Sequence, residues 1–505
     1  MSDANQVVDV EAASASTAAL AQTPASVCDS IGSKGQPAPA GPRHSRLGVL
    51  RHRHFRNVWL GALVSNIGGW MEGVGVQWII AHTTGSAYMM AWLAVAQLGP
   101  TMVLGMLGGI AADRVNRKKL LLFTQGAMMV IAAALALASY LGQATPTVLL
   151  ALSLLQGITL AFNTPAWQVL TPRLVSRDEL TEAISLNGLQ FNLARVVGPA
   201  LAGVLMAYTA SEHSSGATPL FVVNTVSFLF VLVAIAGTPD SPAPPRTEAS
   251  VLHQTKEALS FVFHRRGPRA VFIGMVTFAV LAAPMMRMLP LFAKEVYAET
   301  DPVYRLLMRV VEPASVREVI FSIFLAVIGA GAVAGAIGIR WIPRWYPKHH
   351  FIPLSILLSG MSTAAFSGTR SLLVAIPMLF LGGIFWLWAF NSAFAAMQLL
   401  VPDSMRGRAM SLVNMAVFGA MPLGTFLAGL VGEAARAGAG PGSETQLGVG
   451  VLGAVLAVAG LVMLIWRTPE VDGMSPGETG YQRQPGLLNG ILGTAHRPRS
   501  GRADR

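Results

Sequence analysis

The sequence predicts an all-α membrane protein with twelve transmembrane helices arranged in two six-helix halves. Three observations predict this fold class: an apolar composition, a series of long apolar runs, and an internal repeat. Of the 505 residues, 53% are hydrophobic and 12% are charged, and the mean hydropathy is +0.54. Soluble domains carry about twice that charged fraction, so the composition indicates a chain that lies largely within a bilayer.

Twelve apolar runs follow one another, and each is close to the roughly 20 residues that a helix needs to cross a bilayer. Their limits are 58–81, 88–112, 119–141, 146–168, 183–208, 218–237, 270–293, 319–342, 351–369, 372–400, 409–432 and 447–466. The longest internal connection follows the sixth run and opens with a Pro-rich stretch, 239–245, which predicts a stiff segment. Behind it, Leu252, Leu259 and Phe263 recur at helical spacing, which predicts an amphipathic helix on the membrane surface.

The runs divide the chain into five parts. Residues 1–55 and 468–505 are polar tails, which we expect to be disordered and cytoplasmic. Residues 56–237 and 270–467 are the two six-helix halves, and residues 238–269 form a cytoplasmic linker that contains the amphipathic helix. The first tail holds no apolar stretch long enough for a cleaved signal peptide, so we expect the first run itself to direct insertion.

An internal repeat relates the two halves. The segment 168–172 precedes the fifth run and has the form Gln-x-Leu-x-Pro, as does the segment 398–402 before the eleventh run. After a change of register by four positions, seven residues of the fifth run match the eleventh: Ala183, Ser185, Leu186, Gly198, Leu201, Ala202 and Gly203 match Ala409, Ser411, Leu412, Gly424, Leu427, Ala428 and Gly429. Parallel repeats of this kind are typical of secondary transporters.

The distribution of cations predicts the orientation in the membrane. The net charge is +11, and the cations gather in alternate loops, such as the collar at Arg51–Arg56 and the turn at Arg114–Lys119. Six of the 36 Lys and Arg residues fall in the connections on the other side: Lys294, Arg305, Arg309, Arg317, Arg370 and Arg436. Short basic loops stay in the cytoplasm, so both termini are predicted to be cytoplasmic. This pattern also accounts for the net charge without nucleic-acid binding.

Several classes of site are excluded by the residue types present. The single cysteine, Cys28, allows neither a disulfide framework nor a cysteine-based metal site, and the ten histidines show no metal-ligand spacing. Glycine-rich stretches such as 329–335 lack a P-loop lysine. We find no nucleophile–base arrangement, so we predict no enzymatic activity, no cofactor and no metal.

Three ionisable residues lie inside the predicted spans: Glu72 in the first, Arg195 in the fifth and Arg287 in the seventh. Facing lipid, each would cost about 3 kcal/mol or more, so each should face the protein interior or water. Two interpretations of Glu72 and Arg195 stay open. Either they form a structural ion pair, or Glu72 gains and releases a proton during transport while Arg195 modulates it. Arg287 either meets an anionic part of the substrate or reaches the outer interface.

The fifth run has its polar and small residues on one side. Gly188, Asn192, Arg195, Pro199 and Gly203 recur at steps of three or four, which places them on one broad helical face. Asn192 is therefore a candidate cavity residue beside Arg195. Proline interrupts the hydrogen-bond ladder, and small neighbours permit close packing, so we expect a bend and a packing site there.

The turn between the second and third runs carries a distinctive motif. Its form, Gly-x-x-x-Asp-Arg-x-x-Arg-Lys over 109–118, resembles the signature between the second and third helices of the major facilitator superfamily. Asn116 stands where the family usually has a glycine. The resemblance implies that a set of five residues forms a conformational latch on the cytoplasmic side: Gly109, Asp113, Arg114, Arg117 and Lys118. It also implies that Asp113 faces the start of span eleven near Ala409.

Three further strings, 65–70, 162–168 and 186–199, look like the enterobactin-exporter branch of that superfamily, which includes drug and macrolide efflux proteins. Gly198, Pro199 and Gly203 match in part a packing motif of facilitator antiporters. The resemblance implies export of a siderophore- or drug-like small molecule across the bacterial inner membrane, by proton antiport with alternating access.

The expected partners are a small-molecule substrate, protons and the lipid bilayer, and a monomer is expected. The alternatives are a proton-coupled metabolite importer and a non-transporting membrane sensor or scaffold.

Overall fold

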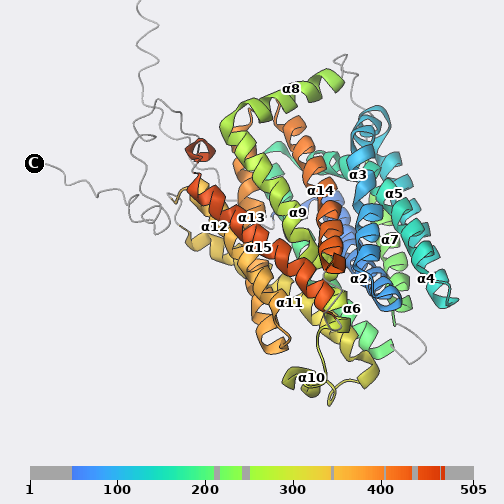
Figure 1. The fold of residues 1–505 in the computed structure, drawn as a ribbon. Helices are drawn as coiled ribbons and strands as arrows, with labels where there is room; N and C mark the ends of the chain where they lie inside the picture. The colour runs from blue at the N-terminus through green and yellow to red at the C-terminus, as the bar shows by residue number, and fades with distance from the viewer. Residues whose placement is uncertain are drawn as a thin grey trace, which may run out of the picture. The chain divides into compact units, whose positions relative to one another are not determined.

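The computed structural model describes residues 48–209, 216–240, 251–342, 346–402, 405–434, 442–466 and 468–472 (Figure 1). Nearly all of both predicted tails, and positions 241–245 of the Pro-rich stretch, lie outside the described residues. Within the helices, the side chains of a few residues are also outside the description, among them Asp113, Asn192 and Leu252.

In the described part of the chain, twelve long helices make up the two halves. The first half contains α2 (Arg53–Thr84), α3 (Ala87–Arg114), α4 (Arg117–Tyr140), α5 (Pro146–Leu174), α6 (Leu180–Thr209) and α7 (Thr218–Ala236). The second contains α9 (Arg266–Glu295), α11 (Val316–Gly338), α12 (Lys348–Gly368), α13 (Leu372–Leu400), α14 (Arg406–Ala434) and α15 (Ser443–Ile465). Eleven of the twelve are long and apolar enough to cross a membrane. The predicted class of an all-α membrane protein is therefore confirmed.

The helix α2 is the one outside those eleven. It has 32 residues, which exceeds the length that a bilayer requires. Glu72, Asn66, Gln77 and several glycines lower its hydropathy, and its role as the first of twelve spans stays a prediction.

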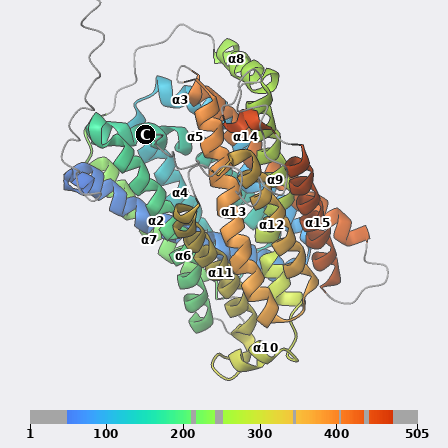
Figure 2. The same ribbon diagram turned by 90° about the vertical axis from the view of Figure 1, so that its left-hand side faces the viewer.

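Short helices lie at the ends of the bundle: η3 (Gly48–Arg51), η4 (Arg177–Glu179), α8 (Val251–His264), α10 (Pro302–Leu307), η5 (Pro313–Ser315), η6 (Ile339–Trp341) and η8 (Pro469–Asp472). The helix α8 falls within the predicted linker and packs on α14 and α9. Ala258 and Val262 form its buried face, whereas Leu259 and Phe263 are exposed. Figures 1 and 2 show α8 and α10 at opposite ends of the bundle.

Small residues allow the helices of each half to pack closely. In the first half α3 packs along α5, and α7 packs along both α2 and α4. In the second half α12 packs along α15, and α13 along both α11 and α12. Gly108 lies against the backbone of Ala161, and Gly331 against that of Phe380. A side chain at either glycine would force the helices apart.

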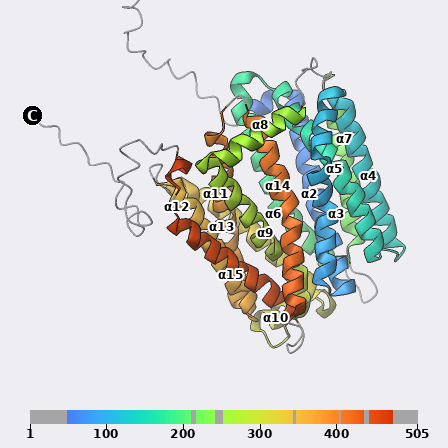
Figure 3. The same ribbon diagram turned by 45° about the horizontal axis from the view of Figure 1, so that its top comes forward.

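The two halves meet mainly through α3 with α14 (Figure 3) and through α6 with α11. Tyr88 and Trp92 on α3 contact the ring of Phe426 on α14, with centroids 5.4 and 5.3 Å apart. Trp78 on α2 stacks on Phe321 of α11 with centroids 5.9 Å apart. These contacts lie toward the end that carries α10 and the α2–α3 connection. The charge pattern predicts this end to be extracellular, and we call it the outer end.

The pair α6 and α11 separates toward the other end, which we call the inner end. Near the outer end Gly203 lies directly against Ser322, and near the centre Gly329 lies against Val196. Toward the inner end, a Cβ at Gly188 would have no neighbouring atom within 4 Å, and Ile337 is 50% exposed. The outer end of this pair is therefore closed, whereas its inner end is open.

Candidate functional site

A buried carboxylate joins three helices of the first half. Glu72 on α2 is 2% exposed. Its Oε1 accepts a hydrogen bond from Gln156 Nε2 on α5 over 2.5 Å, and its Oε2 accepts one from Asn224 Nδ2 on α7 over 2.6 Å. The hydroxyl of Ser227 donates to Asn224 Oδ1 over 3.1 Å and so orients the amide. Both carboxylate oxygens thus have fixed, uncharged donors.

Gly68 is required for this arrangement. A Cβ at this position would lie 2.5 Å from Ser227 Oγ and 2.6 Å from Asn224 Oδ1. The glycine therefore lets α2 approach α7 closely enough for Asn224 to reach Glu72 one turn further along α2.

Arg195 does not pair with Glu72 in the described residues. Its Nη2 donates to the sulfur of Met286 on α9 over 3.3 Å, and its guanidinium carbon lies 5.9 Å from the ring centroid of Trp70. In the described residues, Glu72 and Arg195 are therefore held by other contacts than the ion pair that the sequence allows. Arg195, on α6, instead contacts α2 of the first half and α9 of the second half.

Arg287 lies one residue beyond Met286 and also contacts the first half. Its Nη1 donates to Gln97 Oε1 on α3 over 2.6 Å. The two arginines therefore both lie where the halves meet. Cations at such a position can bind anionic parts of a ligand.

A polar cavity of about 530 Å³ lies within the first half. Its lining residues come from α2, α4, α5, α6 and α7 and carry no formal charge: Ala62, Ser65, Asn66, Gln125, Asn163, Thr164, Trp167, Ile184, Asn187, Gln190, Phe191 and Val231. Eight of them belong to the three sequence strings at 65–70, 162–168 and 186–199. Segments far apart in the sequence thus converge on one site.

Two amides in the cavity wall have unused hydrogen-bonding groups. Gln125 and Gln190 are 7% and 3% exposed. Among the described residues, Gln125 Oε1 and Gln190 Nε2 have no hydrogen-bond partner. Buried polar groups normally have partners, so this acceptor and this donor are suited to bind a ligand that enters the cavity.

Aromatic rings connect the cavity to Arg195. Phe191 lines the cavity and meets Trp70 edge to face, with centroids 6.1 Å apart. Trp70 in turn lies under Arg195. Asn192 follows Phe191 on α6, but its side chain lies outside the described residues.

Two cations of the predicted latch bind backbone carbonyl groups, one in the first half and one at the start of the linker. Arg117 Nε donates to Ala112 O over 3.1 Å, and Lys118 Nζ donates to Thr238 O over 2.6 Å. Asn116 Oδ1 accepts from the backbone of Lys118 and caps α4, so the residue that replaces the family's glycine has a structural use.

The structure describes the other three latch residues, Gly109, Asp113 and Arg114, in less detail. A Cβ at Gly109 would have no neighbouring atom within 4 Å, Arg114 is exposed, and the side chain of Asp113 lies outside the described residues. The latch therefore stays a prediction.

The glycines of the predicted span-five motif both make close contacts. Gly198 packs on α2, where a Cβ would lie 2.6 Å from the Cβ of Trp70, and Gly203 packs on Ser322 across the halves. Pro199 lies inside α6, which continues through it. A functional role for this packing motif remains a prediction.

The amide residues Gln97, Gln125, Gln156, Gln190 and Asn224 do not stand out in the sequence pattern. All lie inside apolar runs, so a polar residue at membrane depth was the available signal. Glu318, a buried acid beside Trp78 at the outer end, lies one residue before the eighth apolar run and therefore does not count as an acid inside a span. In the described residues, no group of three or more His, Cys, Asp or Glu is placed to hold a metal ion.

Comparison with known proteins identifies a family and relatives of similar sequence. The family model described as "Transmembrane secretion effector" matches residues 44–484. A staphyloferrin A transporter of Staphylococcus aureus is 22% identical over 365 residues, which cover 72% of this chain and 85% of that protein. The enterobactin exporter EntS of Citrobacter koseri is 29% identical over 231 residues, 45% of this chain and 54% of the exporter. The chain thus aligns with about half the length of that exporter.

Solved structures show the same fold. A bacterial homologue of the human lysosomal transporter Spinster, in an inward-facing and unoccupied conformation, has a TM-score of 0.59 at 16% identity, and the match covers 82% of this chain and 95% of that chain. The nucleoside transporter NupG has a TM-score of 0.57 at 16% identity, with 81% and 98% covered. The family and the relatives are transporters of small molecules rather than enzymes. The chain belongs to the transmembrane secretion effector family of the major facilitator superfamily.

Proposed function

We propose that this transporter exports a siderophore- or drug-like small molecule from the bacterial cytoplasm across the inner membrane, by proton antiport. The names of two relatives, a staphyloferrin A transporter and an enterobactin exporter, favour a siderophore-like substrate. The direction of transport and the coupling ion are the parts of this proposal that need a test.

Alternating access is supported by the contacts between the halves. The α6–α11 pair is closed at the outer end, where Gly203 meets Ser322, and it diverges toward the inner end. This corresponds to an inward-facing state if the outer end is extracellular. Export then requires the outer contacts to open while the inner ends approach one another.

Substrate binding is assigned to the polar cavity. Its uncharged walls offer an acceptor on Gln125, a donor on Gln190 and the rings of Trp167 and Phe191. Such a lining suits a molecule with hydroxyl or amide groups and an aromatic or apolar part. Arg195 lies next to this cavity through Trp70, and it would receive a carboxylate or phenolate of the substrate.

The proposal of proton coupling rests on one observation, the position of Glu72. The acid lies midway along α2, is fully buried, and contacts two amides rather than a cation. Acids at membrane depth are costly and commonly belong to proton or ion pathways. Because α2 also lines the cavity through Ser65 and Asn66, a change in the proton occupancy of Glu72 can alter the helix that binds the substrate.

The test uses inverted and right-side-out membrane vesicles with the full chain. Proton antiport export predicts that a siderophore or drug accumulates in inverted vesicles with an acidic interior, and that a protonophore abolishes this accumulation. Accumulation in right-side-out vesicles with an acidic exterior would instead identify an importer. If a broad substrate panel is not moved in either preparation by folded protein, the sensor or scaffold alternative gains support.

A further inference from the structure

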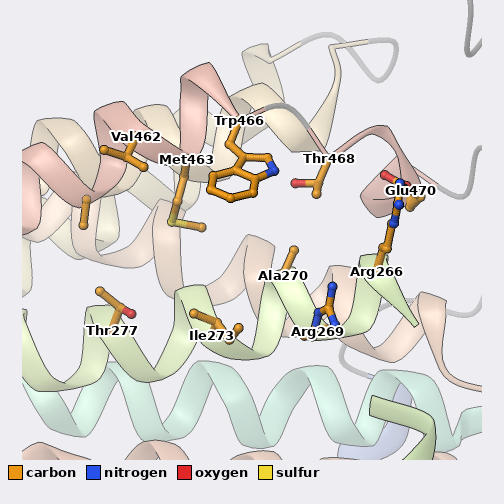
Figure 4. Close-up of a pocket in the computed structure, with 11 residues that line it drawn as sticks. Arg266, Arg269, Ala270, Ile273, Thr277, Val462, Met463, Trp466, Thr468 and Glu470 are labelled. Carbon is orange, nitrogen blue, oxygen red and sulfur yellow. Dashed lines mark ion pairs between the residues drawn. The ribbon is translucent and has the colours of Figure 1, made fainter. Parts of the chain in front are cut away.

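A groove of about 610 Å³ separates the first turns of α9 from the last turns of α15 (Figure 4). We propose that this groove binds one anionic phospholipid, with one of its acyl chains between the two helices and its phosphate at Arg266 and Arg269. The inference does not depend on the transported substrate, because the groove is formed by the second half and the polar cavity by the first.

The walls of the groove are suited to an acyl chain. Both helices are long and apolar enough to cross a membrane. Ile273 on α9 and Val462 on α15 line the groove and are 53% and 48% exposed. An apolar side chain exposed on a membrane-crossing helix contacts lipid rather than water. Met463, also in the wall, has a flexible side chain that adapts to ligands of variable shape.

One end of the groove is positively charged. Arg266 and Arg269 occupy the first turn of α9, and the residue before that turn, Arg265, provides no side-chain cap for the helix. The dipole of a helix N-terminus favours an anion. Glu470 lies 3.9 Å from Arg266, and this one carboxylate leaves a net positive charge at the site.

The aromatic residue beside this charge fits the boundary of a membrane. Trp466 is the C-cap residue of α15 and is 77% exposed. Figure 4 shows Trp466 and Thr468 on one side of the groove and Arg269 and Ala270 on the other. Tryptophan is enriched at the level of lipid headgroups, and basic pockets between membrane helices bind anionic headgroups.

The chain's own C-terminal segment is the main alternative occupant. Residues 473–505 follow η8, which carries Glu470. The segment contains five arginines and two acids, so its net charge has the same sign as that of Arg266 and Arg269. Charge complementarity therefore favours an anionic lipid.

The test measures lipid binding by the purified full chain in neutral detergent. Phosphatidylglycerol, phosphatidylcholine and inorganic phosphate are titrated separately, while native mass spectrometry counts bound lipid and the melting temperature is recorded. We expect phosphatidylglycerol to bind and to raise the melting temperature, and the other two probes to have little effect. Arg269→Gln should weaken phosphatidylglycerol binding about fivefold, the change that one cation at a membrane surface produces.

Two further variants make the result specific. Arg340→Gln removes an exposed arginine of η6 away from the groove, and it should bind phosphatidylglycerol like the unmodified chain. Ala270→Trp fills the groove and should abolish binding while the lipid-free melting temperature changes little. Equal binding of phosphatidylcholine, an equal effect of phosphate alone, or unchanged binding by both groove variants would each overturn the proposal.

Discussion

Asn224 on α7 donates a hydrogen bond to Glu72 on α2 over 2.6 Å, across 152 positions of sequence. Together with Gln156, it supplies the polar contacts of a carboxylate buried within the first half. Neither donor is charged, so among the described residues no hydrogen-bonded cation fixes the charge of Glu72. We therefore propose proton exchange as the step that changes the charge at this depth.

Glu72→Gln should fold and should lose proton-driven export. The substituted amide keeps the size of the side chain, and rotation of the Gln156 amide would offer an oxygen to the new NH₂ group, so we expect a loss of about 1 kcal/mol in unfolding free energy. Protonophore-sensitive export in vesicles should disappear, whereas exchange of substrate for substrate should persist. A Glu72→Gln, Arg195→Gln double variant that exports normally against a gradient would exclude Glu72 as the coupling site.

Gln125→Met and Gln190→Met should weaken substrate binding without loss of stability. Each change removes a buried polar atom that lacks a partner, so the unfolding free energy should stay constant or rise by up to about 1 kcal/mol. The KM for the substrate should rise about fivefold to tenfold, the effect of one lost hydrogen bond.

Ser153→Ala is the control for this pair. Ser153 Oγ is also buried without a partner in the described residues, but Ser153 does not line the cavity. The variant should change stability in the same direction with an unchanged KM. A KM unchanged in both glutamine variants would remove the cavity from the binding site.

The fold class could be predicted because run length and hydropathy are local properties of a sequence. The contacts of Glu72 could not, because they depend on which faces of α2, α5 and α7 meet. The sequence pattern placed Glu72 and Arg195 at similar depth, which suggested an ion pair. In the structure, Gly68 lets α7 approach α2, so that Asn224 reaches the acid, while Arg195 lies over Trp70.

The polar cavity was visible in the sequence only as three separate strings. Their resemblance to known exporters marked them, but helical periodicity does not tell which polar face turns toward another. The structure brings Asn66, Asn163 and Gln190 to one cavity. Gln125 on α4 belonged to none of the strings, and only the packing of α4 beside the cavity identifies it.

The cluster around Glu179 should make stability depend on pH. Glu179 accepts hydrogen bonds from Ser176 Oγ and Arg51 Nη2, both over 2.8 Å, and contacts His52 Nε2 over 2.6 Å. These contacts, that of His52 first, lower the pKa of Glu179 below its ordinary value of 4.5. A lowered pKa in the folded state means that the stabilisation is present above pH 4.5 and is lost as the pH falls through the folded-state pKa.

The measurement compares Glu179→Gln with the unmodified chain from pH 7 to pH 3. The variant should melt at a lower temperature near neutrality, and the difference should shrink below pH 4.5 as the native carboxylate becomes protonated. Glu257→Gln is a matched control, because Glu257 pairs with Arg408 at an exposed site. A constant difference across the whole pH range would contradict the electrostatic explanation.

Asp113→Asn should express normally and transport poorly. By its resemblance to the family signature, Asp113 is expected to contact the start of α14 when the inner ends close. A carboxylate at a helix N-terminus contributes about 0.3–1 kcal/mol when exposed and up to about 2 kcal/mol when partly buried, enough to shift a two-state equilibrium without unfolding the bundle. The initial export rate of the Asp113→Asn variant tests this prediction. A rate equal to that of the unmodified chain would refute the latch.

Gly203→Ala should hold the outer end open. Its Cβ would overlap Ser322 on α11, and overpacking of this kind costs about 1–3 kcal/mol. Opening the outer end relieves that overlap. With Cys28 replaced by serine, a cysteine in place of the buried Ala202 should therefore react faster with a membrane-impermeant maleimide, and export should fall. Gly188→Ala is the control, because it gives α6 the same gain in helix propensity at a position where the added Cβ would meet no neighbouring atom within 4 Å. Equal labelling in the two variants would show that the Gly203–Ser322 contact does not control the outer end.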